Sequence, residues 1–512
     1  MTPVGVATAT PAPTGLPEGS GSLRSVLDDV PIGLVTVVVV VVGSLMVGVA
    51  TTLGPMFAMA AVVAVLFGLA LLAWPTAAAT LLPLIAVVSG LRRGFPIPGL
   101  RLSEVLAVVC AGTIFISAPR MRRLSWNGLD WCAFAYTAIA IVLPAYKAHG
   151  DGTLSTGTLM TLVGPVQFFL IYRAAAVASS TPGVATRMVR LLLLSSIPTN
   201  IVAVMQAFSV PGVREWVVSV TDVNSYSTPG FTALGRATGL FPHWHVLAGF
   251  DVIIVVLAIA LWLGADRQVM RPRALVAVAL LAAIGIGVSV TATSAIGAVA
   301  ALFLLGLIAR RLGQLLRWTV PAGVAGAIVF WPLVQARITE QGLGGDSGGG
   351  GTPQTIAYRL DVWTTQYLPA IKASPVTGYG DVIPERISWE YSESIYLSLL
   401  LRGGLVLFLA YVVWTVATLS VAAVTAASES ASPAEVAVAR TVLTVMLVLV
   451  PMQLLFPYLL NSGIPHALWL LIGLSRQPWG ATFRQEVRLP EDVRFPEDAR
   501  LAEDVRLPEF AR

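Results

Sequence analysis

Residues 245–264 read HVLAGFDVIIVVLAIALWLG, a stretch in which Asp251 is the one acidic side chain. A helix that crosses the hydrocarbon layer of a membrane needs about 20 consecutive, mostly apolar residues. This stretch has that length and composition, so it predicts a transmembrane helix. Comparable runs recur at 32–52, 55–74, 76–91, 102–118, 131–146, 158–179, 189–208, 274–291, 293–309, 318–335, 403–424, 437–457 and 464–475. The sequence therefore predicts an all-α, polytopic integral membrane protein with about 12–14 transmembrane helices.

The composition of the chain supports the same fold class. The 512 residues are 56% hydrophobic and 12% charged, and the mean hydropathy is +0.81. A soluble globular domain has about 25% charged residues, so this chain lacks the charge to cover a water-exposed surface of its size. These values exclude an ordinary cytosolic enzyme, a disordered chain and a nucleic-acid-binding protein. Arginines at the membrane edges explain the formal net charge of +5.

Clusters of arginine predict the orientation of the spans, because cytoplasmic loops carry an excess of positive charge. With an even number of spans, four arginine-bearing loops lie on the same side as both chain ends, which we expect to be the cytoplasm. The agreement among these loops supports the predicted spans. They carry Arg120, Arg122 and Arg123; Arg187 and Arg190; Arg267, Arg271 and Arg273; and Arg310, Arg311 and Arg317.

One short segment on the opposite side breaks this charge rule. Residues 91–101 connect two predicted spans on the outer face, yet they include Arg92, Arg93 and Arg101. Two explanations stay open. Either a short span is miscounted, or these arginines meet an anionic group outside the membrane.

The remaining segments divide the chain into a membrane domain with two tails. Residues 1–30, rich in Pro, Gly, Ser and Thr, predict a flexible cytoplasmic tail, and residues 31–475 form the predicted membrane domain. Residues 476–512 repeat a hexapeptide that contains proline in most copies, which predicts a low-complexity cytoplasmic tail. The outer face has two long loops, over residues 209–244 and 336–402. Long loops carry function more often than short turns, so we expect the site there.

Few ionisable side chains fall within the predicted spans. Those that do lie toward span ends, as Glu104, Arg173, Asp251 and Arg402 show. We expect Arg173 to extend to water at the cytoplasmic side. Ion-coupled transporters usually need acidic groups deeper in the bilayer, so this distribution directs attention to the outer loops instead.

The first outer loop ends in a segment with candidate binding residues. Arg236 lies just before a predicted span, where its guanidinium could bind a phosphate or extend to lipid headgroups. His243 and His245 flank Trp244, but the sequence offers no third ligand nearby, so we predict no metal site. The favoured interpretation is an aromatic belt at the membrane interface with hydrogen-bonding histidines.

The second outer loop contains a predicted helix and a carboxylate at the membrane edge. Arg359, Trp363 and Tyr367 are spaced four apart, which places them on one face of a helix. Glu393 comes shortly before an apolar helix. Its carboxylate could cap that helix by accepting backbone N–H bonds, or it could act as a general base. The residues alone leave both roles open.

Together, these motifs resemble the O-antigen ligase and O-antigen polymerase superfamily, over roughly residues 30–475. The segment Arg236-Ala-Thr-Gly-Leu-Phe-Pro-His243 resembles the family's Arg-x-x-Gly-Phe motif. Thr293–Gly297 is similar to its Ser-Arg-Gly turn, although Ala295 stands where the Arg would be. The family signature Arg…Trp…Pro-x-x-Gly-x-Gly…Asn-x-Tyr-Leu…Gly resembles a series formed by Arg359, Trp363, Pro375, Gly378, Gly380, Ser394-Ile-Tyr-Leu397 and Gly403.

The resemblance implies a GT-C-like membrane glycosyltransferase that polymerises or ligates glycans at the extracytoplasmic face of a bacterial plasma membrane, in cell-surface polysaccharide biosynthesis. The donor would be a glycan on polyprenyl diphosphate, and the acceptor a glycan or a lipid. Membrane lipids would be further partners, and no cofactor or nucleic acid would be needed. An alternative is a transporter or flippase-like carrier for an anionic solute or lipid, suggested by the number of spans and the outer arginines.

The resemblance also implies roles for individual residues. Arg236 and Arg359 would stabilise the charge of the departing diphosphate, and Glu393 would be the general base. Ligases of this family carry a His at the position of Glu393, which favours a polymerase without deciding between the two. The residues expected to contact substrate are Arg92, Arg93, His243, His245, Trp363 and Tyr396.

Overall fold

The chain is helical throughout the part that the structure describes. The computed structural model describes residues 68, 70–71, 73–94, 101–117, 126–153, 163–221, 236–264, 267–340, 354–381, 384, 387, 393–476 and 478–479. Over these residues the β-structure amounts to an isolated bridge between Leu91 and Thr221. The predicted all-α class is therefore confirmed. The N-terminal tail, the run at 32–52, most of the run at 55–74, the arginine loop at 118–125 and nearly all of the C-terminal tail lie outside the described residues.

Among the described helices, six are long and apolar enough to cross a membrane. They are α7 (Gly128–Gly150), α10 (Val184–Ala207), α12 (Trp244–Leu263), α15 (Leu312–Glu340), α18 (Ile395–Ala426) and α19 (Pro433–Met452). Shorter apolar helices are α6 (Leu102–Ser117), α9 (Val163–Ala178), α13 (Pro272–Val288), α14 (Ala292–Ile308) and α20 (Ile464–Ser475). Each of these helices overlaps one of the apolar runs that the sequence predicts.

Two predicted spans differ from the structure. The run at 76–91 is not one helix but two short ones, α4 (Pro75–Leu81) and α5 (Leu84–Val88). Pro83 lies at the break, because its ring has no backbone N–H to continue the helical hydrogen bonds. The run at 403–424 belongs to a longer helix, since α18 begins at Ile395 and places Arg402 inside the helix. Gly404, with a φ of 59°, kinks α18 just after Arg402.

The helix α12 forms the centre of the molecule. Almost all of its side chains are buried, and it packs against α10, α13, α14, α19 and α20. A helix that is apolar all round is typical of a position enclosed by other helices. The segment that precedes α12, from Arg236 to His243, is thereby fixed against the helix bundle.

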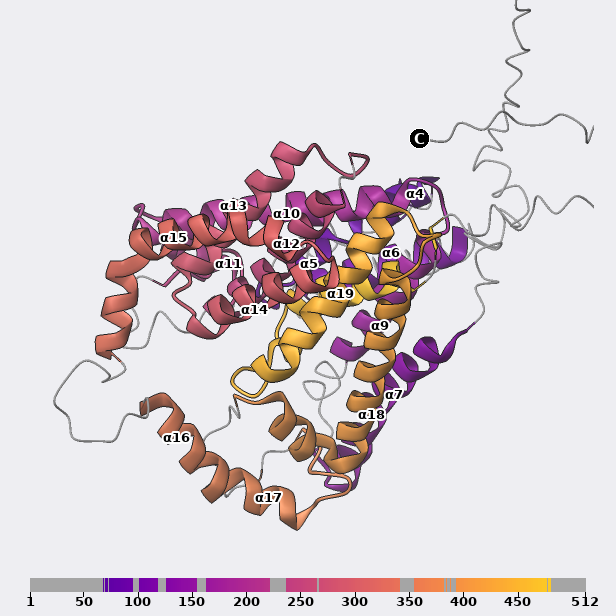
Figure 1. Cartoon of the computed structure of the whole chain (residues 1–512). Helices are drawn as coiled ribbons and strands as arrows, with labels where there is room; N and C mark the ends of the chain where they lie inside the picture. Colours follow the sequence, from indigo (N-terminus) through magenta and orange to yellow (C-terminus); the bar gives the residue numbers. More distant parts are fainter. Residues whose placement is uncertain are drawn as a thin grey trace, which may run out of the picture.

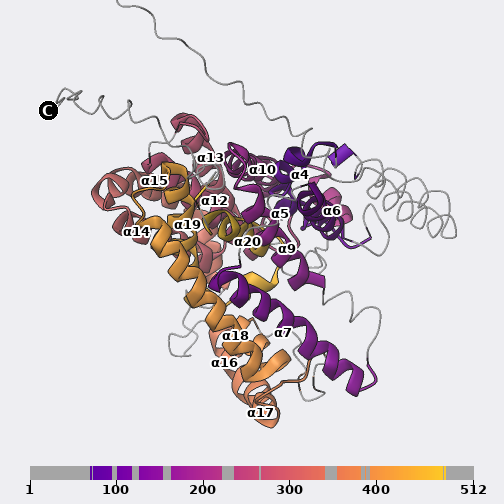
Figure 2. The same ribbon diagram turned by 90° about the vertical axis from the view of Figure 1, so that its right-hand side faces the viewer.

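The helices α7 and α18 lie side by side and project beyond the central bundle (Figures 1 and 2). Near their far end lie α16 (Gln354–Val362), a π-helical turn over Trp363–Tyr367, and α17 (Leu368–Ala373). The sequence predicts one α-helical face for Arg359, Trp363 and Tyr367. The α-helix ends at Val362 and a π-turn, which uses more residues per turn, continues from Trp363 to Tyr367. Trp363 and Tyr367 nevertheless pack in the same hydrophobic cluster.

Charged side chains reach deeper into the bundle than the sequence predicts. Asp130 of α7 is fully buried and accepts hydrogen bonds from Arg173 Nη1 at 2.6 Å and from Arg476 Nε at 2.9 Å. Arg173 therefore does not extend to water as expected, because a buried carboxylate binds its guanidinium. This cluster connects α7, α9 and the end of α20.

Two of the predicted cytoplasmic arginine loops lie together. Arg190, near the start of α10, donates hydrogen bonds to the carbonyl oxygens of Gln268 and Val269, which follow α12. The contact agrees with the expectation that these loops share one side of the protein.

Candidate functional site

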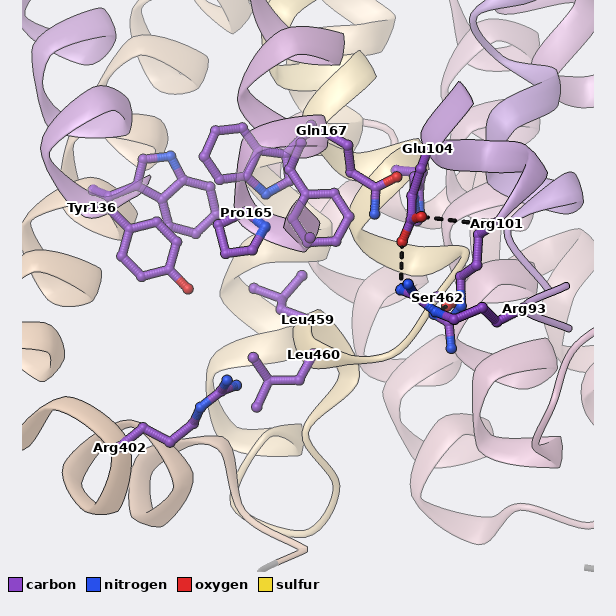
Figure 3. A pocket seen from close by; sticks show the side chains of 15 residues that line it. Arg93, Arg101, Glu104, Tyr136, Pro165, Gln167, Arg402, Leu459, Leu460 and Ser462 are labelled. Atoms are coloured by element: carbon purple, nitrogen blue, oxygen red, sulfur yellow. Dashed lines mark hydrogen bonds and ion pairs between the residues drawn. The ribbon is translucent and has the colours of Figure 1, made fainter. Parts of the chain in front are cut away.

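A cavity of ≈ 370 Å³ lies among α6, α7, α9, α18, α20 and the loops beside them (Figure 3). A volume of this size is within the range of small-molecule sites. The two connections that contribute to it, residues 91–101 and 459–462, both lie on the predicted outer face. The cavity therefore opens among segments that the charge pattern predicts to be extracytoplasmic.

One wall of the cavity is aromatic. The rings of Trp414 and Trp469 stack with centroids 4.7 Å apart, and Tyr136 stacks on Trp414 at 5.4 Å. Phe168 lies against Trp469 at 6.4 Å. Rings that lock one another in this way form a rigid apolar surface.

The opposite part of the cavity is cationic. Arg93 Nη2 forms an ion pair with Glu104 Oε1 at 2.7 Å, and the backbone N–H of Arg101 donates to Glu104 Oε2 at 3.1 Å. Arg101 Nη1 also donates to Ser462 Oγ at 3.2 Å. Figure 3 shows Arg402 across the cavity from Arg93 and Arg101. The lining thus includes more guanidinium groups than carboxylates, which favours an anionic ligand.

Several buried polar atoms in the residues that line this cavity lack a hydrogen-bond partner among the described residues. They are Arg93 Nη1, Gln167 Oε1, Trp414 Nε1 and His466 Nε2. The side chains of Gln167, Trp414 and His466 belong to residues that are at most 5% exposed. His466 Nδ1 accepts from the backbone N–H of Gly463, so the neutral ring carries its proton on Nε2. An unsatisfied buried polar atom costs about 1–3 kcal/mol, and three of these four atoms are N–H donors while Gln167 Oε1 is an acceptor.

Arg402 is held in place by a backbone-to-backbone contact. The N–H groups of Tyr379 and Gly380 donate to the carbonyls of Leu401 and Arg402, at 2.7 and 2.8 Å. Gly378 packs directly on this backbone, where a Cβ would overlap the Leu401 carbonyl. The Arg402 guanidinium itself pairs with Asp381. The glycines of the predicted signature therefore allow a loop to fix an arginine of the cavity.

Glu393 forms an ion pair with Arg359. Its φ of 52° is left-handed, a conformation that is uncommon for a residue other than glycine. The first turn of α18 receives no side-chain cap from its N-cap residue, Ser394. This ion pair is neither of the two roles that the sequence leaves open for Glu393, so helix capping and general-base catalysis both stay predictions. Strained backbone of this kind is often found at functional positions.

Three further predicted binding residues lie outside the cavity lining. Trp363 packs in a small hydrophobic cluster with Val362 and Tyr367. Tyr396 donates its hydroxyl to the carbonyl of Val450. Arg92 is exposed, and its backbone N–H donates to the carbonyl of Val220 at 2.9 Å. Their roles in binding substrate stay predictions.

Arg236 occupies a second polar region next to α12. It is 7% exposed, and its guanidinium carbon lies 5.0 Å from the centre of the Trp244 ring. His243 Nδ1 accepts from the backbone N–H of His245, and the two imidazoles are parallel with centroids 5.2 Å apart. Burial, with a smaller effect from the Arg236 charge, lowers the pKa of His243 to about 3. His243 is therefore neutral, in agreement with the predicted hydrogen-bonding role.

The segment from Phe456 to Gly463 separates this region from the cavity. On one side, Phe456 stacks on His245 at 4.4 Å and the Tyr458 hydroxyl lies 3.0 Å from Ser294 Oγ. On the other side, Leu459, Leu460 and Ser462 line the cavity. The residues just before this segment contact the start of α18, because the N–H of Ile395 donates to the carbonyl of Gln453 at 3.0 Å.

The predicted catalytic residues therefore fall in two places. Arg359 and Glu393 are paired at the start of α18, whereas Arg236 lies beyond the Phe456–Gly463 segment. Of the predicted binding residues, Arg93 alone lines the cavity. Motif spacing does not indicate Gln167 and His466, because isolated polar residues in apolar helices carry no spacing pattern. The departure from the charge rule at residues 91–101 was the signal that pointed to Arg93 and Arg101.

Within the described residues, no group of three His, Cys, Asp or Glu side chains could hold a metal ion. Comparison with known proteins identifies no relative, because no protein-family model and no curated protein sequence matches the chain.

Proposed function

We propose that this chain is a membrane glycosyltransferase that polymerises or ligates glycans carried on polyprenyl diphosphate. The proposal starts from the motif resemblance and adds a binding site to it. In this proposal the diphosphate binds between Arg93, Arg101 and Arg402, and the first isoprene units lie along the wall formed by Trp414 and Trp469. The extracytoplasmic face of a bacterial plasma membrane remains the proposed location.

The observation that carries the proposal is the position of the arginines that break the charge rule. Arg93 and Arg101 line a cavity that also contains Arg402 and the aromatic wall of Trp414 and Trp469. An amphiphile with a phosphate head and a hydrocarbon tail matches both halves of this lining. The second explanation for residues 91–101, an anionic group at the outer face, is the one that this arrangement favours.

The proposed reaction is a direct displacement at the anomeric carbon of the donor. The acceptor hydroxyl attacks that carbon, its proton passes to the Glu393 carboxylate, and the glycosidic C–O bond to the diphosphate breaks. The polyprenyl diphosphate leaves with the bonding electrons, and the arginines stabilise its charge. Glu393 lies in the loop just before α18, and Arg402 lies inside that helix.

Arg236 keeps its predicted catalytic role as part of this proposal, from a position on the far side of the Phe456–Gly463 segment. Arg236 lies over the ring of Trp244, and the neighbouring His243 stacks on Phe456, which belongs to the part of the chain that borders the cavity. We expect Arg236 to be needed for activity, and less so for binding of the carrier.

Binding of the carrier is tested with the purified full chain in lipid nanodiscs. The probe is polyprenyl diphosphate, with polyprenol as the uncharged control. We expect at least a tenfold loss of affinity in Arg93→Ala and Arg402→Ala, since a charge-assisted bond contributes about 1.5–3 kcal/mol. The matched control is Arg187→Ala, because Arg187 is exposed, does not line the cavity and lies on the predicted cytoplasmic side. Equal affinity for the alcohol and the diphosphate would contradict the proposed site.

Activity is tested by following polysaccharide chain length in cells that depend on the variant protein. We expect Glu393→Gln, Arg359→Ala and Arg236→Ala to yield short or unattached glycans. Normal chains in normal amounts from all three variants would remove the catalytic assignment. A carrier for an anionic lipid would bind the same probe, but it would move the probe across a vesicle membrane without forming a glycosidic bond.

A further inference from the structure

The most apolar part of the bundle contains a pair of polar side chains that the proposed reaction does not use. Asp251 of α12 and Asn200 of α10 are both fully buried. Asn200 Nδ2 donates a hydrogen bond to Asp251 Oδ1 at 2.8 Å. The pair lies about two turns below the start of α12, far from the cavity that the carrier is proposed to occupy.

The two remaining oxygens of this pair face the same small space. Asn200 Oδ1 and Asp251 Oδ2 are buried and have no hydrogen-bond partner among the described residues. Both converge on the Cα of Gly285 in α13, where a Cβ would overlap both of them. The absence of a side chain at Gly285 therefore leaves room for the pair, and the distances of 2.0 and 2.2 Å from the Cβ position put the two acceptors within 4.2 Å of each other.

Two acceptors this close repel unless a proton lies between them. Among the described residues, no arginine, lysine or histidine forms an ion pair with Asp251, so an ionised carboxylate here would be desolvated without compensation. A proton on Asp251 Oδ2 resolves both problems, because the O–H donates to Asn200 Oδ1 while Oδ1 continues to accept from Asn200 Nδ2. The result is a neutral ring with two hydrogen bonds.

We propose that Asp251 is a proton-binding residue that stays protonated at neutral pH and shares its proton with Asn200. The acid–amide pair joins α10 to α12 across Gly285. It also supports the segment that contains Arg236, because the carbonyl of Thr199, next to Asn200, lies against Gly239. A metal cation is a poorer occupant, since these two oxygens supply fewer ligands than a sodium or calcium ion takes.

Infrared spectroscopy of the purified full chain tests the protonation state directly. We expect the wild-type spectrum at pH 7 to contain the carbonyl stretch of a protonated carboxylic acid that is missing from Asp251→Asn. A wild-type spectrum identical to that of the variant in this region, with an added carboxylate band instead, would overturn the proposal.

Thermal unfolding separates a shared proton from a bound cation. An Asn at position 251 offers the same N–H and C=O pattern as the protonated acid, so Asp251→Asn should shift the unfolding temperature by less than about 2 °C. Asp251→Ala and Gly285→Ala should lower it by more than about 5 °C. The control is Gly112→Ala in α6, where a Cβ meets nothing within 4 Å. If sodium ions stabilise the wild type but not Asp251→Asn, the site binds a cation and the proposal fails.

Discussion

Gly404 and Val376 meet backbone to backbone, so closely that a Cβ on Gly404 would overlap the carbonyl group of Val376. The N–H groups of Leu405 and Val406 donate to the carbonyls of Pro375 and Val376 at 2.8 and 3.2 Å. The turn at residues 375–377, within the second predicted outer loop, is thus hydrogen-bonded to the kink in α18. Because Arg402 precedes that kink, the contact also fixes one end of the proposed carrier site.

We expect Gly404→Ala to separate the loop from α18. The new Cβ would overlap the Val376 carbonyl, and a φ of 59° is unfavourable for alanine. The combined cost should be about 2–4 kcal/mol of unfolding free energy, and the affinity for polyprenyl diphosphate should fall with it. Thermal unfolding in detergent and the nanodisc binding measurement check both effects. Gly323→Ala in α15 is the control, since a Cβ there meets nothing within 4 Å.

We expect Arg359 and Glu393 to be energetically coupled. Each partner of the ion pair is about one-fifth exposed, at 20% and 24%, so solvent screens the pair only in part. A double-mutant cycle with Arg359→Ala and Glu393→Gln should give a coupling energy of about 1 kcal/mol in unfolding free energy. Additive effects within about 0.3 kcal/mol would show that the pair does not contribute to folding.

The positions of the helices along the chain could largely be predicted from sequence, because crossing a membrane requires long apolar runs. The predicted helix boundaries were wrong where a proline or a glycine changes the backbone. Pro83 divides the run at 76–91 into two helices. The helix α18 begins at Ile395, before the predicted run at 403–424, and is kinked at Gly404. Hydropathy alone cannot find either boundary, since the side chains on both sides of each boundary are similar.

The candidate site was harder to predict than the fold. The ion pair joins Arg359 and Glu393, which the motifs predict as catalytic residues but not as partners of each other. The positions of Arg402 and His466 depend on contacts between helices far apart in sequence, and no local pattern encodes those contacts. Asp251 was identified, but its pairing with Asn200 needed the packing of α10 on α12.

We expect Asp130→Asn to destabilise the bundle severely. Asp130 receives Arg173 and Arg476 in a region that water does not reach, so removing its charge leaves two buried guanidinium groups without a counter-charge. Breaking a buried ion pair from one side costs about 3–5 kcal/mol. Unfolding temperature in detergent is the measurement. Asp151→Asn, at the exposed end of the same helix, should leave it unchanged.

We expect the stability of the folded chain to depend on pH through His243. Folding lowers the pKa of this imidazole to about 3, from its ordinary value of 6.5, chiefly because of burial. Between these pH values the unfolded chain binds a proton that the folded chain does not. The contribution of His243 to the unfolding free energy is therefore complete above pH 6.5 and declines as the pH falls, by up to about 2 kcal/mol at pH 5.

His243→Asn isolates this effect, because the Asn side chain can still accept the hydrogen bond from the N–H of His245 but does not titrate in this range. We expect the wild type to lose a few °C more than the variant in unfolding temperature between pH 7 and pH 5. Other titrating groups act equally on both proteins and cancel in the difference. Parallel pH profiles for the two proteins would mean that His243 is protonated in the folded chain. The assignment of a neutral His243 imidazole beside Arg236 would then be incorrect.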